Sequence, residues 1–296
     1  MGVYLSKPET SKVTVKGQGN GVKFGASCMQ GWRMSMEDAE ICEAEFTENS
    51  SLFAVFDGHG GKEVAVFCEK YFGSELKKNS HFKADGDMTK ALTETFLIMD
   101  EMLESLDGQK ELAEIKGDGT ASFAGCTANV ILIHKNMIYC ANAGDSRTIM
   151  WTKNEVAHLS TDHKPEDEIE ENRITKAGGY ISMGRVNGNL NLSRALGDLE
   201  YKKDKSITPA EQVISGVPDV LSWPLTKDDK FLVMGCDGVW ELLNADDICR
   251  IVNNKVDDCD DLTLLANEIL DKGMAPSLGT GEGCDNMSCI VIKLNY

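Results

Sequence analysis

Three short apolar runs in this chain each adjoin an aspartate. Apolar runs of this length, bounded by glycine or turn residues, are typical of interior β-strands. Because functional groups concentrate where buried strands end, we expect the three aspartates to share one site. The run 52–56 is followed by Asp57, and the run 231–236 is followed by Asp237. The run 287–292 is preceded by Asp285.

Helical spacing and end signals predict five helices. Apolar positions recur every three or four residues in the first two, and Asp87 is suited to cap the second. Pro165 favours a helix start, and the glycine pair at 178–179 favours its end. The expected helices cover 62–78, 88–106, 165–178, 244–256 with Asn244 as cap, and a stretch from Asp260 or Asp261 to Lys272.

Short strands joined by two or three residues predict antiparallel hairpins. The expected strands are 24–28, 126–134, 137–143, 147–152 and 155–159, with connections at 135–136, 144–146 and 153–154, and a further hairpin at 187–188. The polar stretch 107–124 predicts an irregular connection. This order of elements predicts an α+β fold, with residues 1–22 as an N-terminal tail and residues 23–296 as one domain.

Composition and charge narrow the function classes. The 296 residues are 42% hydrophobic, which is typical of a globular protein. A formal net charge of −18 argues against binding to nucleic acid or a polybasic membrane contact. Most of the ten cysteines lie in apolar runs without a Cys-x-x-Cys pair, which predicts reduced thiols and a cytoplasmic protein. No run reaches the roughly 18 apolar residues of a membrane span.

The first six residues match the N-myristoylation pattern, with Gly2 second and Ser6 sixth. The alternative is an ordinary disordered start. A single myristoyl chain supports only weak, reversible membrane binding. We therefore expect a cytoplasmic monomer that is partly peripheral to a membrane if Gly2 is acylated.

The acidic residues near strand ends predict a metal site. Asp57, Asp237 and Asp285, together with Glu37, Asp38 and Asp145, form an all-oxygen set, which magnesium or manganese prefers over zinc. The alternative is that each aspartate caps a turn. Carboxylates gathered at one site repel one another unless cations neutralise them, which favours the metal interpretation.

Two such ions can activate water for in-line displacement at phosphorus, so phosphoester hydrolysis is the predicted reaction. Candidates for binding the phosphoryl group are Arg33, Arg147, Arg185 and Arg194, and His59 can protonate the leaving oxygen. No cysteine is followed six residues later by arginine, which excludes a Cys-x5-Arg nucleophile. His59 occupies the place of the second acid that an aspartyl-phosphate mechanism needs.

Seven motifs in order resemble the metal-dependent serine/threonine protein phosphatases of type 2C, over nearly the whole chain. They are Gln30-Gly31-Trp32-Arg33 with Met36-Glu37-Asp38-Ala39, Val55-Phe56-Asp57-Gly58-His59-Gly60-Gly61, Asn142-Ala143-Gly144-Asp145-Ser146-Arg147, Asp162-His163-Lys164-Pro165, Ser193-Arg194-Ala195-Leu196-Gly197-Asp198, Cys236-Asp237-Gly238-Val239-Trp240 and Asp285-Asn286-Met287-Ser288.

The resemblance implies a central antiparallel β-sandwich flanked on both faces by helices, four layers in all. It implies a binuclear magnesium or manganese centre in which Asp57 bridges the ions, and phosphorylated proteins as substrates. By the same resemblance, Glu37 and the Gly58 carbonyl serve one ion, Asp237 and Asp285 serve the other, Asp145 helps hold a weaker third ion, Arg33 binds phosphate and His59 protonates the leaving group.

Alternatives remain open at this point. An inactive relative can bind phosphoproteins as a scaffold, and the same site can hydrolyse small phosphate esters. Arg33 can instead pair with Glu37 or Asp38, and His59 can be a surface histidine. We expect Arg147, Arg185 and Arg194 to have structural roles.

Overall fold

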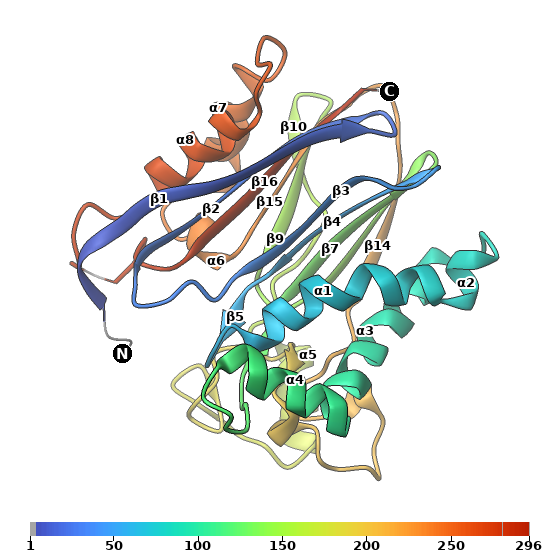
Figure 1. Cartoon of the computed structure of the whole chain (residues 1–296), viewed down its shortest axis with the longest axis vertical. Helices are drawn as coiled ribbons and strands as arrows, with labels where there is room; N and C mark the ends of the chain where they lie inside the picture. Colours follow the sequence, from blue (N-terminus) through green and yellow to red (C-terminus); the bar gives the residue numbers. More distant parts are fainter. Residues whose placement is uncertain (1–3, 280, 296) are drawn as a thin grey trace.

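Two antiparallel sheets form the centre of the protein in this computed structural model, which describes residues 4–279 and 281–295 (Figure 1). The first sheet has the order β1 (Tyr4–Gly19), β2 (Val22–Arg33), β16 (Met287–Leu294), β15 (Asp229–Gly235), β9 (Arg147–Thr152), β10 (Glu155–His158). The second has the order β14 (Asp219–Pro224), β8 (Met137–Ala143), β7 (Ala128–His134), β4 (Ser50–Phe56), β3 (Ala39–Thr47).

Helices cover the outer face of each sheet. The second sheet carries α1 (Glu63–Lys78), α2 (Ser80–Lys83), α3 (Met88–Glu104) and α4 (Leu106–Lys116). The first carries α7 (Ala245–Asn253) and α8 (Thr263–Gly273), with the short α6 (Asp237–Trp240) after β15. These layers confirm the predicted four-layer α+β architecture.

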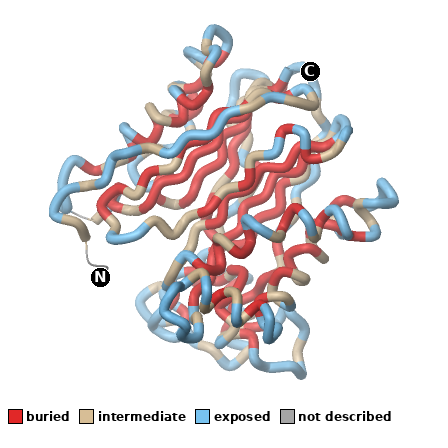
Figure 2. The backbone as a smooth tube through the Cα atoms, in the orientation of Figure 1, coloured by how far each residue is buried: buried red, intermediate tan, exposed pale blue. Residues whose placement is uncertain are grey.

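The second sheet has a core on each face, one between the two sheets and one beneath its helices. Its central strands therefore bury both faces, which explains why their apolar runs do not alternate with polar residues. All seven residues of β4 are buried. Phe53 and Val55 point into the core between the sheets, whereas Leu52 and Phe56 point toward the helices. Phe24 of β2 meets Phe53 edge to face at 5.3 Å and so joins the two sheets. Figure 2 shows this burial along the central strands.

A third, small sheet lies beyond the end of β4. Its order is β13 (Leu196–Gly197), β6 (Gly125–Cys126), β5 (Gly58–His59). Nearby lie α5 (Glu168–Lys176), the hairpin of β11 (Ile181–Ser182) and β12 (Arg185–Val186), and 3-10 turns at Leu199–Tyr201 and Pro209–Glu211. This sheet brings residues near position 197 beside residues near position 59.

Local signals predicted several ends correctly. Asp87 caps α3 by accepting a hydrogen bond from the Lys90 amide at 3.1 Å. Asn244 caps α7 by accepting one from Asp247 at 2.9 Å. All ten cysteines are free thiols, as expected. No helix within the described ranges is both long and apolar enough to cross a membrane.

Two predictions about polar segments were wrong. Residues 4–19 of the expected tail form the edge strand β1, paired with β2 from Tyr4–Arg33 to Gly19–Val22, because an edge strand with one solvated face carries few apolar residues. Gly2 lies outside the described residues. The expected irregular connection at 107–124 begins with α4, which Ser105 caps by accepting a hydrogen bond from Gly108 at 3.0 Å.

Two hairpin predictions also need correction. Residues 144–146 do not join a hairpin, because β8 belongs to the second sheet and β9 to the first. They cross between the sheets instead. Asn187 and Gly188 do reverse the chain, since Val186 pairs with Leu190, but the strands β11 and β12 are joined by Met183 and Gly184, both with positive φ.

Candidate active site

The three strand-end aspartates meet at one end of the sandwich. Asp57 follows β4 of the second sheet, while Asp237 follows β15 and Asp285 precedes β16, both of the first. Carboxylate oxygens of Asp237, Asp285 and Glu241 lie within 4.8 Å of one another. The same limit holds for an oxygen of Asp57, one of Asp38 and the Cys236 sulfur. The structure thus brings the expected residues together.

Glu37 lies on the loop after β2 and is held there by three bonds. Its Oε2 accepts a hydrogen bond from the Gly61 amide at 3.2 Å, its Oε1 accepts one from Ser35 at 2.8 Å, and its own amide donates to Asn286 Oδ1 at 2.9 Å. Gly58 packs against this loop, since a Cβ there would lie 2.3 Å from the Glu37 carbonyl oxygen. Glycine therefore lets the two backbones approach each other.

Asp145 lies on the crossover between the sheets. Its side chain is 2% exposed and forms an ion pair with Lys164. Burial opposes the charge of Lys164, but the neighbouring carboxylates, Asp145 first, outweigh it and raise the pKa of Lys164. The Asp145 carboxylate therefore already has one cationic neighbour in the protein itself.

Arg33 lies beside the aspartates and pairs with one of them. Its Nη2 donates to Asp285 Oδ2. Arg33 therefore does form an ion pair, but its partner is Asp285, and the alternative that named Glu37 or Asp38 as the partner is wrong. Its buried Nε has no hydrogen-bond partner among the described residues. Arg33 thus keeps one buried donor that no described residue satisfies.

His59 has a buried partner that its place in the sequence did not reveal. Its Nε2 lies 2.7 Å from Asp198 Oδ2. Asp198 is 4% exposed and adopts a left-handed backbone with φ of 50°. The buried Nδ1 of His59 lacks a partner within the described ranges. The alternative of a free surface histidine is therefore wrong.

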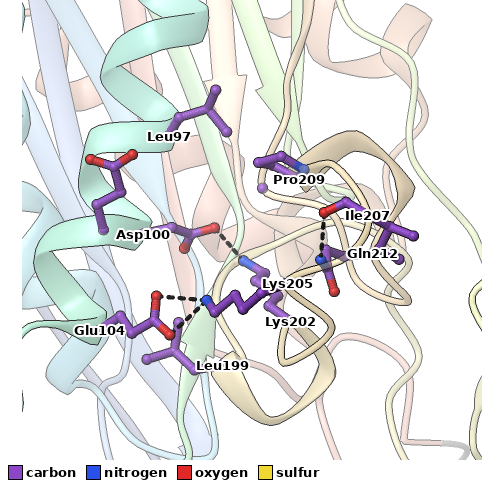
Figure 3. A pocket seen from close by; sticks show the side chains of 11 residues that line it. Leu97, Asp100, Glu104, Leu199, Lys202, Lys205, Ile207, Pro209 and Gln212 are labelled. Atoms are coloured by element: carbon purple, nitrogen blue, oxygen red, sulfur yellow. Dashed lines mark hydrogen bonds and ion pairs between the residues drawn. The ribbon is translucent and has the colours of Figure 1, made fainter.

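The segment that carries Asp198 is anchored to α3. Asp100 accepts a hydrogen bond from the Gly197 amide at 2.8 Å and one from Lys202 Nζ at 2.6 Å. Lys202 also donates to the Ala195 carbonyl at 2.7 Å. Figure 3 shows Asp100 and Lys202 facing each other across the pocket between α3 and the segment 199–216. This ion pair fixes the backbone on either side of β13.

The electrostatics of the cluster favour a bound cation. Burial, and then the neighbouring carboxylates, raise the pKa of Asp57 and of Asp237 well above the ordinary value. Burial also raises the pKa of Asp38 to about 6. The buried Oδ1 of Asp38 finds no partner in the part of the chain that the structure describes. An all-oxygen set with an unused buried oxygen suits a hard divalent cation.

The remaining arginines have structural partners, as expected. Arg147 forms two hydrogen bonds to Asp162 at 3.0 and 2.9 Å. Arg194 binds Glu170 at 2.7 Å, and Arg185 donates to the Asn189 carbonyl at 2.7 Å.

Sequence reasoning assigned no role to Asp198, Glu241 or Asn286. Glu241 follows Asp237 by four residues, a spacing that places both on one helical face, and this signal was available. Asn286 donates to the Gln30 and Ser35 carbonyls at 2.8 and 2.9 Å. The Asn286 bonds join positions 256 and 251 residues apart, and the His59–Asp198 bond joins positions 139 residues apart. No local pattern reveals contacts at such separations.

Residues 22–280 match the family model of protein phosphatase 2C. The chain is 52% identical to probable protein phosphatase 2C 4 of Paramecium tetraurelia over 99% of both chains. It is 37% identical to probable protein phosphatase 2C 21 of Arabidopsis thaliana, covering 99% of this chain and 92% of that protein. The crystal structure of a phosphatase from Toxoplasma gondii is similar in fold, with a TM-score of 0.78, 24% identity and 96% of each chain covered.

Proposed function

The chain belongs to the protein phosphatase 2C family and is thus a metal-dependent serine/threonine protein phosphatase, and we propose that it works through a binuclear magnesium or manganese centre. The observation that supports this centre is the meeting of five carboxylates at the end of the sandwich, from Asp38, Asp57, Asp237, Glu241 and Asp285. Their mutual repulsion is relieved when cations bind among them.

The residues divide into two groups, each of which would hold one ion. Asp57 lies near both Asp38 and Asp237, which suits it to bridge two ions. Asp237 and Asp285 would hold one ion, Glu37 and the Gly58 carbonyl the other, and Asp145 a weaker third. When bound, such ions supply an activated water and neutralise phosphoryl charge.

The other side chains bind the phosphate and move a proton. Arg33 donates to a phosphoryl oxygen through its unpartnered Nε while Asp285 holds its other end. His59 gives a proton to the serine or threonine oxygen as that oxygen leaves. Because Asp198 occupies Nε2, the nitrogen available for this transfer is Nδ1. Asp198 acts as a positioning residue for the ring.

The test is turnover of a phosphothreonine peptide by the full chain across divalent ions. Chelation is expected to abolish turnover and manganese to restore it. Asp57→Asn is expected to lower kcat by several orders of magnitude, as electrostatic groups at a reacting centre do. Full activity after chelation would contradict the metal centre, no turnover with any ion would support a scaffold, and faster hydrolysis of sugar phosphates would identify a small-ester hydrolase.

Localisation and assembly follow as separate proposals. We propose a cytoplasmic monomer that binds membranes weakly when Gly2 carries myristate. In a myristoylating host, part of the wild-type protein should sediment with membranes, and Gly2→Ala should remove that part because one acyl chain supplies most of the affinity. Equal partitioning of the two forms would reject the anchor, and sedimentation equilibrium would test the monomer.

A further inference from the structure

An apolar cavity of about 260 Å³ lies between α1, α4 and the 3-10 turn after β13. Its walls include Val64, Leu112, Ala124 and Leu199. Val64 is 1% exposed and Leu112 2% exposed, so both belong to the core beneath the cavity. Glu104, Glu200 and Lys203 form its polar edge. A cavity with an apolar wall and a charged edge suits an aliphatic or aromatic side chain.

Phe123 also lines this cavity and is 72% exposed. A single exposed phenylalanine is ordinary on a protein surface. This one, however, adjoins a cavity whose lining includes the apolar side chains of Leu103, Leu112 and Leu199. Exposed aromatic residues beside a pocket are the groups that most often anchor a protein partner.

The cavity lies next to the loop that carries His59. In the small sheet, His59 pairs with Gly125 and Gly125 pairs with Gly197, which lines the cavity. Neighbouring strands are 4.7–4.9 Å apart, so Gly197 lies about 10 Å from His59. A Cβ on Gly60 would lie 3.6 Å from the Cα of Ala124, another wall residue. The cavity therefore shares a wall with the His59 loop.

We propose that this cavity is a subsite for an apolar side chain of the phosphoprotein substrate, two or three residues from the phosphorylated residue. An extended peptide advances about 3.3 Å per residue, so two or three residues advance roughly 7–10 Å, which is comparable with the distance of about 10 Å between His59 and Gly197. The occupant is a polypeptide because the activity brings one to His59. The subsite rests on the proposed function and adds a substrate preference to it.

The test measures kcat/KM of the manganese-loaded full chain on a series of phosphothreonine peptides. Each pair of peptides differs at one position, leucine against serine, and the series covers the three positions before and the three positions after the phosphothreonine. The wild type should prefer leucine at one position two or three residues away by about tenfold, the effect of roughly 1.4 kcal/mol. Phe123→Ala should reduce that preference at least threefold, and Phe123→Leu should retain most of it. Leu106→Ala is the matched control, because Leu106 is 82% exposed and lies on α4 outside the cavity lining.

The ratio between two peptides separates the subsite from the chemistry. A wild type that turns over both peptides equally at every position overturns the subsite and leaves the phosphatase proposal standing. An unchanged preference in Phe123→Ala also overturns it. Hydrolysis of p-nitrophenyl phosphate without turnover of any phosphopeptide overturns the proposed function and the subsite together.

Discussion

At the scale of single residues, two pairings hold the side chains to which we assign catalytic roles in the proposed function. Arg33 is held by Asp285 with its Nε unpartnered among the residues described, and His59 is held by Asp198 with its Nδ1 likewise unused. A buried polar atom without a partner costs about 1–3 kcal/mol. In the proposed mechanism, a phosphoryl oxygen of the substrate would satisfy the Arg33 atom and the leaving oxygen would satisfy the His59 atom.

Asp198→Asn should affect poor leaving groups most, because an amide cannot stabilise the protonated ring as a carboxylate does. The kcat for a phosphothreonine peptide should fall about 10²-fold or more, within the usual range for general acid catalysis. The kcat for p-nitrophenyl phosphate, whose leaving group needs no proton, should fall far less, and His59→Gln should show the same split.

Asp85→Asn is a matched control for this substitution. Asp85 also has a positive φ, of 53°, and also pairs with a histidine, with its Oδ1 2.6 Å from Nε2 of His134. His134 ends β7, whereas the active site lies past the other end of that strand. Asp85→Asn should leave both rates unchanged. An equal loss on both substrates in Asp198→Asn would make Asp198 a structural residue only.

At the scale of elements, strand registers and crossovers position the site. The paired strands β15 and β16 place Asp237 and Asp285 at the same edge, since Gly235 lies opposite Cys289. β8 and β9 belong to different sheets, so Asp145 lies between the sheets at that edge. The packing of α8 on β2 supports these strands from outside.

Gly25→Ala should weaken this packing. A Cβ on Gly25 of β2 would lie 2.2 Å from the Thr263 amide nitrogen and 2.3 Å from the Leu262 carbonyl carbon at the start of α8. Overpacking of this kind typically costs about 1–3 kcal/mol. The denaturant midpoint should fall at constant m-value. Gly279→Ala is the control, because no atom of the described residues beyond its chain neighbours lies within 4 Å of its Cβ. An equal midpoint in the two variants would contradict the close packing.

At the scale of the whole molecule, the chain is acidic, and some of its carboxyl groups are buried. The formal charge is −18, and burial raises the pKa of Asp38 to about 6 and of Glu40 to about 8. A raised pKa means that the folded state holds protons more tightly than the unfolded state. The stability that these groups contribute is present below about pH 4 and is lost as the pH rises through 6 and 8.

The metal-free protein should therefore lose stability between pH 5 and 8. Tm should fall by several degrees, since about 1 kcal/mol corresponds to roughly 2–4 °C in proteins of 150–250 residues. Burial opposes the charge of Glu170, but the two arginines beside it outweigh burial and lower its pKa to about 2. Glu170 is therefore ionised throughout this range, and its contribution to the free energy of unfolding stays constant. Saturating manganese should raise Tm, because cations bind the ionised carboxylates of the folded protein. It should also flatten or reverse the decline of Tm with rising pH.

Glu40→Gln provides the internal check on this prediction. The substitution removes a titrating group whose Oε1 is buried without a partner in the ranges described, so the decline of Tm in the upper half of the range should become shallower. A metal-free Tm that rises from pH 5 to 8 would refute the assignment of raised pKa values to the cluster.

Local pattern and tertiary structure each determined part of this protein. Apolar runs and capping residues are local properties, so the strand before Asp57, the helix capped by Asp87 and the chemical type of the candidate metal ligands followed from the sequence by itself. The strand at 4–19 and the crossover at 144–146 did not, because pairing with a distant strand decides both. The bond between His59 and Asp198 joins positions 139 residues apart, and only the folding of the small sheet brings them together.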